Sequence, residues 1–119
     1  MSLRSIPADE PAATLLDWRI HEVQRATLNA PSPHVVGYAL EAGEGRVSSA
    51  IVELDVAKKR IRTKSGRLYF LSGESARHPD ADYVWSRWLR IHDATLLREL
   101  TLQELAQLLS GKQELDAGP

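Results

Sequence analysis

The chain has 119 residues and a net charge of −1, with 43% hydrophobic and 26% charged residues. This length suits one domain with a buried core, and the near-neutral charge excludes binding to nucleic acid or membranes through overall charge alone. The absence of cysteine excludes disulfides, cysteine nucleophiles and thiolate zinc sites.

The two ends of the chain differ in composition from its middle. Residues 1–13 are rich in alanine and proline and predict a flexible lead-in, and residues 112–119 predict a frayed tail. Residues 14–111 between them predict a single domain. We expect no signal peptide and no membrane span, because the longest near-apolar run, residues 35–40, is far shorter than the ~20 residues that a span requires. The expected location is the cytoplasm.

The first predicted elements are strands and loops. Residues 14–28 fit neither period cleanly, and we predict a short helical turn before Asp17 followed by a strand over residues 18–25. Residues 29–33 contain two prolines and predict a loop. Residues 34–41 predict a strand, and the two glycines of residues 42–45 predict a turn.

Residues 46–71 predict three antiparallel strands over residues 47–54, 60–64 and 68–71, with Ser65 and Gly66 as a hairpin turn. In the second strand the cations alternate with Ile61 and Thr63, which predicts one basic face and one buried face. Residues 34–73 hold seven basic and four acidic side chains. The basic face predicts either a solvated surface or a nucleic-acid contact, in which Tyr69 could stack a base. The candidate contact residues are Lys58, Arg60, Arg62, Lys64, Arg67 and Tyr69.

Residues 80–91 predict an amphipathic helix with Asp80 as its N-cap. Trp85 and Trp88 lie in its apolar arc, which favours packing on the sheet over ligand stacking. His78 with Asp80 and Asp82 has the residue types of a metal site, but the two carboxylates also suit a helix N-terminus and no second ligand cluster accompanies them. We therefore predict no metal.

The leucine-rich residues after Asp93 predict two short helices. Asp93 is the expected cap of the first, and Thr101 with Glu104 forms a capping box that starts the second, which Gly111 ends. Seven leucines between positions 96 and 109 exceed what a terminal segment needs for its own packing. They predict either docking on the chain's own sheet or a protein interface. The candidate interface residues are Leu96, Leu97, Leu100, Leu105, Leu108 and Leu109.

No hydrolase, zinc-protease or phosphate-loop motif is present. His21, His34 and His92 are isolated in the sequence, which is more typical of core or boundary histidines than of catalysts. We predict neither catalytic residues nor a cofactor, and we expect a non-enzymatic protein.

Several patches together resemble a group of small bacterial proteins of unknown function. The resemblance covers about residues 17–91, assigns no activity, cofactor or catalytic residue, and favours a strand over residues 18–25. The patches are Trp18-x-Ile20, His34-Val35-Val36-Gly37-Tyr38, Gly45-Arg46-Val47-Ser48-Ser49-Ala50-Ile51, Thr63-x-Ser65-Gly66-Arg67-x-Tyr69-x-Leu71 and Tyr83-Val84-Trp85-x-Arg87-Trp88.

The elements together predict an α+β domain. Four or five antiparallel strands form a meander or a small, partly closed barrel, in which the last four strands are sequential neighbours. The tryptophan helix packs across one face, and short leucine-rich helices follow. The expected function is a binding or regulatory module that acts on an unidentified protein partner or on a second copy of the chain. The alternative is a weak nucleic-acid binder that uses the basic hairpin.

Overall fold

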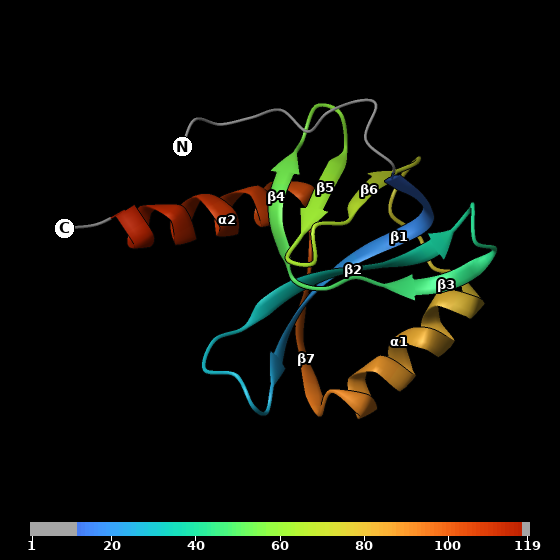
Figure 1. Ribbon diagram of the computed structural model, residues 1–119, viewed down its shortest axis with the longest axis horizontal. Coiled ribbons are helices and arrows are strands. Elements are labelled where there is room, and N and C mark those ends of the chain that lie inside the picture. Colours follow the sequence, from blue (N-terminus) through green and yellow to red (C-terminus); the bar gives the residue numbers. More distant parts are fainter. Residues whose placement is uncertain (1–11, 118–119) are drawn as a thin grey trace.

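The computed structural model describes residues 12–117, which fold into an α+β arrangement of a mixed sheet and two helices (Figure 1). The predicted α+β class is confirmed. The sheet is not closed into a barrel, and it has more strands than predicted. The elements are β1 (Ala12–Arg25), β2 (Ser32–Ala39), β3 (Glu44–Val47), β4 (Ile51–Asp55), β5 (Arg60–Thr63), β6 (Leu68–Leu71), α1 (Pro79–Ile91), β7 (Ala94–Leu100) and α2 (Leu102–Ala117).

The long strand β1 organises the sheet. The strand order is β3-β2-β1-β6-β5-β4, and β7 also pairs with β1. One edge of β1 bonds to β2, and the other is shared between β6 at its start and β7 at its end. The β1–β6 pair is parallel, so the predicted all-antiparallel meander is wrong at this point. Two parallel strands must be joined by a long crossover, which here is the chain from β2 to β5. A local sequence pattern therefore cannot predict this pairing.

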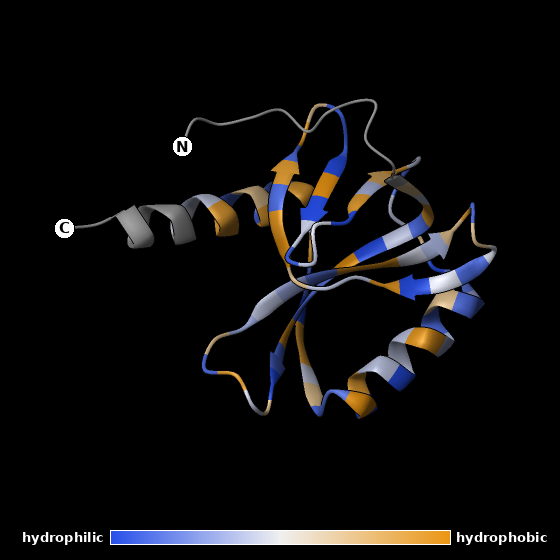
Figure 2. Ribbon diagram, viewed as in Figure 1, coloured by the Kyte–Doolittle hydropathy of each residue, from blue (hydrophilic) through white to orange (hydrophobic). Residues whose placement is uncertain are grey.

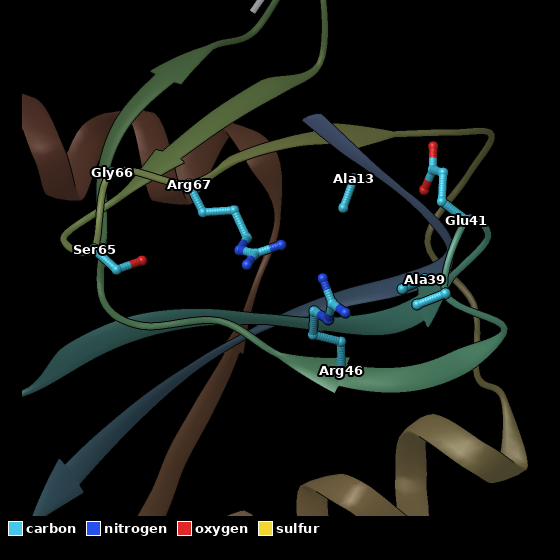
Figure 3. Close-up of a pocket in the computed structure, with 8 residues that line it drawn as sticks. Ala13, Ala39, Glu41, Arg46, Ser65, Gly66 and Arg67 are labelled. Carbon is cyan, nitrogen blue, oxygen red and sulfur yellow. The ribbon is translucent and has the colours of Figure 1, made fainter. Parts of the chain in front are cut away.

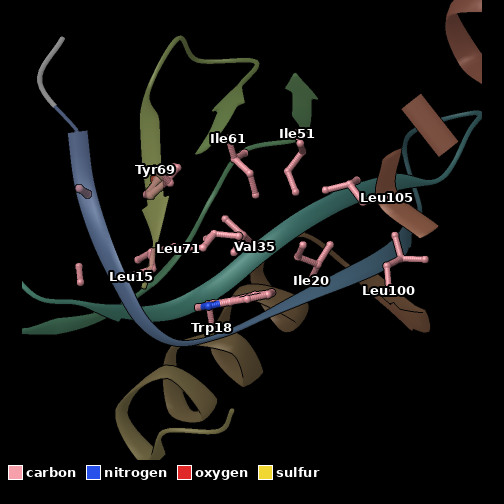
Figure 4. Close-up of a cluster of buried hydrophobic side chains, with 12 residues drawn as sticks. Leu15, Trp18, Ile20, Val35, Ile51, Ile61, Tyr69, Leu71, Leu100 and Leu105 are labelled. Atoms are coloured by element: carbon pink, nitrogen blue, oxygen red, sulfur yellow. The ribbon is translucent and has the colours of Figure 1, made fainter. Parts of the chain in front are cut away.

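A bulge in β1 explains why residues 14–28 fit no simple period. Asp17 has φ 47°, and the register with β2 shifts between Leu16 and Arg19. The extra residue resets the alternation, so Leu15, Trp18 and Ile20 all lie in one core although regular pleating would place Leu15 and Trp18 on opposite faces (Figure 4). The predicted helical turn before Asp17 is therefore absent, and the predicted strand over residues 18–25 is confirmed as part of β1.

The predicted strand over residues 47–54 is divided in two. β3 ends at Val47 and pairs with β2, whereas β4 begins at Ile51 and pairs with β5. Residues 48–50 cross between them: the Ser48 hydroxyl accepts a hydrogen bond from the Val35 N–H (3.0 Å), and the Ala50 carbonyl accepts one from Lys64. The small side chains of this crossing segment let the backbone change neighbours without leaving its polar groups unpaired.

The β5–β6 hairpin forms as predicted. Ile61 and Thr63 are buried while Arg60 and Arg62 lie on the opposite face, and Figure 2 shows the matching alternation of colour along β5. Gly66 has φ 90° in the turn, which a residue with a Cβ rarely adopts. The prediction that the last four strands are sequential neighbours holds in part: β2 pairs with β3, and β4, β5 and β6 are neighbours, but β3 and β4 lie at opposite ends of the sheet order.

The tryptophan helix α1 is confirmed and packs over β2 and β3, with Ala81 and Trp85 buried against Val23 and Val36 (Figure 1). Its N-cap is His78 and not Asp80, because the His78 Nδ1 accepts a hydrogen bond from the Asp80 N–H (3.1 Å).

The predicted helix after Asp93 is wrong, since these residues form strand β7. β1 offers an unpaired edge beside them, and the six residues of β7 that pair with it satisfy more backbone groups than one short, isolated helix. The capping box is confirmed: Glu104 accepts a hydrogen bond from the Thr101 N–H (2.8 Å), and the Thr101 hydroxyl accepts one from the Glu104 N–H (3.0 Å). The helix continues past Gly111 to Ala117.

The main core lies between the curved sheet and the start of α2 (Figure 4). It includes Leu100 and Leu105, which join side chains from β1, β2 and β4–β6. The predicted lead-in falls mostly on residues 1–11, which lie outside the described residues together with residues 118 and 119; residues 12 and 13 belong to β1.

Candidate functional site

The structure divides the leucines of the predicted interface. Leu100 and Leu105 are buried at 3% and 0% exposure in the chain's own core, so they offer no surface to a partner. Leu96 and Leu97 are 44% and 48% exposed on β7. The partly buried side chains on α2 that pack against the core include Leu108 and Leu109.

β7 has an open edge. It bonds to β1 on one side, and none of the strands within residues 12–117 bonds to its other side. It is seven residues long, against four for β3 and five for β4 at the ends of the sheet. The register with β1 shifts between Glu22 and Val23, so Leu97 has no partner residue on β1. A bulge of this kind changes the direction in which the side chain of the extra residue points. The middle of this open edge is therefore apolar.

Two further apolar side chains are exposed near the start of β7. The Ala26 N–H donates to the Asp93 carbonyl (3.0 Å), which ties the end of β1 to the turn before β7. Leu28 and Ile91 each lie two residues along the chain from this bond and are 45% and 71% exposed. Exposed apolar side chains thus occur both on β7 and beside the turn that precedes it.

The basic face of the β4–β5–β6 sheet is partly paired within the chain. Arg62 forms an ion pair with Glu53 (2.8 Å), and the Arg60 guanidinium lies 4.5 Å from the centre of the Phe70 ring. Lys58 and Lys64 are exposed. Four of the predicted contact residues therefore share this region of the sheet.

The other two predicted contact residues lie elsewhere. Tyr69 stands opposite Ile61 in the ladder and is 4% exposed, so its ring faces the core and cannot stack a base beside the cations. The alternation of β6 instead places Phe70 beside Arg60. Arg67 precedes β6 and lines a pocket with Arg46.

The histidines that are isolated in the sequence converge around α1. His21 and His34 are direct partners in the β1–β2 ladder. His21 stacks on Trp85 with ring centres 4.8 Å apart, and Trp88 lies 4.7 Å from His34 and 4.4 Å from His92. Trp85 is 6% exposed, so the predicted core role is confirmed for this residue.

His34 is held by two hydrogen bonds and by burial. Its Nδ1 lies 2.9 Å from the Ser48 carbonyl, which only a protonated Nδ1 can bond, and its Nε2 lies 2.7 Å from the Ser32 hydroxyl. Burial lowers the pKa of His34 below its usual value. The neutral imidazole therefore accepts from Ser32 and donates to Ser48, which joins β2 to the crossing segment.

A buried cation beneath α1 was not predicted. Arg19 is 5% exposed; its guanidinium forms an ion pair with Asp82 and lies 3.0 Å from the His21 Nε2. Burial, together with the charge of Arg19, lowers the pKa of His21 to about 4. The available signal is the alternation of Trp18 and Ile20 with Arg19 and His21, but such alternation alone does not show that a helix, here α1, covers the polar face.

Two of the residues considered as metal ligands, His78 and Asp82, interact with other side chains. His78 caps α1 and stacks on Tyr38 with ring centres 4.5 Å apart. Asp82 pairs with Arg19 and also with Arg77 (3.4 Å). Among the described residues, no three histidine or acidic side chains form a group that could hold a metal ion.

No family model matches this chain, and comparisons with curated proteins and with solved structures find no match. Within residues 12–117, neither helix is long and apolar enough to cross a membrane.

Proposed function

We propose that this chain is a non-enzymatic binding or regulatory module that acts through protein contacts in the cytoplasm, and that its partner is a second copy of itself. The observation that carries the proposal is the open edge of β7, with Leu96 and Leu97 exposed at its centre.

A strand edge presents a row of unpaired backbone donors and acceptors, which is a template for another strand. β7 lacks the lysines and prolines with which many proteins protect such an edge. Leu97 is the middle residue of β7. Antiparallel pairing of two copies about a two-fold axis near Leu97 therefore brings the exposed leucines of both copies together. It buries apolar surface and satisfies both backbone edges in one contact.

The double variant Leu96→Arg/Leu97→Arg tests this interface. We expect the parent chain to form a dimer in sedimentation equilibrium or in chromatography with light scattering, and the variant to be monomeric at the same concentrations. In the dimer, the two arginines of each copy would be buried against those of the other copy and would repel them. Leu96 and Leu97 are too exposed in the single chain to be needed for its folding.

Val56→Arg is the matched control, because Val56 is 45% exposed in the turn after β4, far along the sheet order from β7. We expect this variant to dimerise like the parent. A parent chain that stays monomeric at all concentrations, or a double variant that dimerises normally, would contradict the proposal.

A second candidate function is weak binding of nucleic acid at the basic face. The observation that favours it is the placement of Phe70 beside Arg60, with Lys58 and Lys64 exposed in the same region. A half-buried aromatic ring next to cations is the arrangement that holds single-stranded nucleic acid by stacking and phosphate contacts.

This candidate predicts affinity that falls steeply with salt and is lost in Arg60→Glu/Arg62→Glu. The control Arg87→Glu/Arg90→Glu makes the same charge change on the exposed face of α1 and should bind as the parent does. Fluorescence anisotropy with a labelled oligonucleotide measures both. Equal binding by the two double variants would eliminate the basic face as the site.

A further inference from the structure

A pocket of about 690 Å³ opens between β3 and the β5–β6 hairpin (Figure 3). This volume is within the usual range for sites that bind small molecules. The small side chains of Ala13 and Ala39 leave the space open. Its other lining residues are Glu41, Ala42, Arg46, Ser65, Gly66 and Arg67.

Two cations converge in this pocket. Arg46 extends into the pocket from β3, and Arg67 extends into it from the position immediately before β6. Figure 3 shows their guanidinium groups pointing toward one another. Arg46 has Glu44 at 3.7 Å and the Tyr69 hydroxyl as neighbours. The Arg67 side chain has no hydrogen bond or ion pair with any residue from 12 to 117. Like charges that face each other repel unless an anion lies between them.

The carboxylate of Glu41 in the pocket wall already has hydrogen-bond partners within the chain. One oxygen of Glu41 accepts a hydrogen bond from the Thr14 N–H and the other from the Thr14 hydroxyl, both at 2.7 Å. These bonds lower the pKa of Glu41, so the side chain remains charged. Figure 3 places it at the opposite end of the pocket from Arg67. The pocket therefore has a cationic end and an anionic end, which fits a ligand with its negative charge at one end only.

The two arginines are held by rigid parts of the fold. Arg46 is paired with Gly37 in the β2–β3 ladder, and the Tyr69 ring beneath it is buried. Arg67 follows the tight turn at Gly66, and the Ser65 N–H donates to the Ser49 hydroxyl (3.1 Å), which ties that turn to the crossing segment. The backbone at both arginines therefore needs little rearrangement when a ligand binds.

We propose that this pocket binds a small molecule that carries one phosphate group, with the phosphate between Arg46 and Arg67. A guanidinium binds phosphate or carboxylate through two parallel hydrogen bonds. Two such groups that approach from opposite walls need acceptors on more than one side of the anion. A tetrahedral phosphate has them, whereas a planar carboxylate offers the geometry of two parallel hydrogen bonds to only one guanidinium at a time. The remaining volume accommodates the body of the molecule.

Titration of the full chain with inorganic phosphate at constant ionic strength tests the site, by calorimetry and by the shift of the unfolding temperature. We expect phosphate to raise the unfolding temperature, and Arg67→Gln to weaken phosphate binding about tenfold or more because a charge-assisted pair is lost. Without phosphate, Arg67→Gln should unfold at a higher temperature than the parent, since it relieves the repulsion with Arg46. A purely structural arginine would not produce this reversal.

The matched control is Lys64→Gln, which removes the same charge from an exposed side chain that does not line the pocket. We expect it to bind phosphate as the parent does. Arg67 is exposed, so its substitution leaves the core intact. The proposal is overturned if phosphate does not stabilise the parent, if acetate stabilises it equally, or if Arg67→Gln retains the phosphate response. Dimerisation is expected to be unchanged in Arg67→Gln, so the two proposals fail independently.

Discussion

The polar network under α1 shows how single residues adapt to a buried environment. Arg19 is buried with Asp82 as its ion-pair partner and His21 as its hydrogen-bond partner. A buried charge is tolerated only when it is paired, and removal of one partner leaves the other unpaired at a cost of several kcal/mol. His21 must remain neutral in this setting, because a second positive charge beside Arg19 would be repelled.

Stability should therefore fall in mild acid. The pKa of His21 is about 4 in the folded chain against about 6.5 in an unfolded one, so the unfolded chain takes up the proton first. This group has no effect on stability above about pH 6.5 and reduces it progressively as the pH falls toward 4. Between pH 7 and pH 5 we expect His21 to lower the free energy of unfolding by about 2 kcal/mol.

Urea unfolding at a series of pH values measures this effect. His21→Gln keeps an acceptor for Arg19 without a titrating ring, so its stability should depend less on pH in this range. The neighbouring charges Arg77 and Asp82 are the same in both chains. An equally steep pH dependence in parent and variant would show that His21 is not responsible.

At the scale of elements, the contact between α1 and β3 depends on one glycine. A Cβ at Gly45 would lie 2.6 Å from the Asp80 carbonyl carbon and 2.8 Å from the Ala81 Cα. Both are backbone atoms of the first turn of α1, which cannot turn aside as a flexible side chain would. Asp82, in the same turn, forms the ion pair with Arg19.

We expect Gly45→Ala to lower the free energy of unfolding by about 1–3 kcal/mol, because the helix must move away from the strand. Gly111→Ala is the control: Gly111 lies within α2 with no atom within 4 Å of an added Cβ, so this change should be neutral or stabilising by up to about 1 kcal/mol. Denaturant unfolding compares the two. A Gly45→Ala chain as stable as the parent would mean that the helix does not lie this close to β3.

At the scale of the whole molecule, β1 joins two regions with different roles. Its first half, beside β6, forms one wall of the pocket that contains Arg46 and Arg67. Its second half, beside β7, supports the open edge that carries Leu96 and Leu97. The two proposed sites share a scaffold but no residues. A small phosphorylated ligand and a second copy of the chain could therefore bind at the same time.

Features that depend on near neighbours in the chain were predictable. The hairpin at Ser65 and Gly66, the alternation along β5, the helix with Trp85 and the capping box at Thr101 each arise from interactions within a few residues. Local periodicity and the residue types at turns and caps are therefore enough to predict them.

Features that depend on distant segments were not predictable. β7 is a strand because β1, some 70 residues earlier, offers it an open edge, and this outweighs a local leucine pattern that favours a helix. The burial of Tyr69, the ion pair of Arg19 with Asp82 and the convergence of Arg46 with Arg67 likewise depend on which segments meet in the folded chain. The free energies of burial and of charge pairing arise from contacts between segments that are distant in the chain. The pattern of residues along the sequence does not specify those contacts.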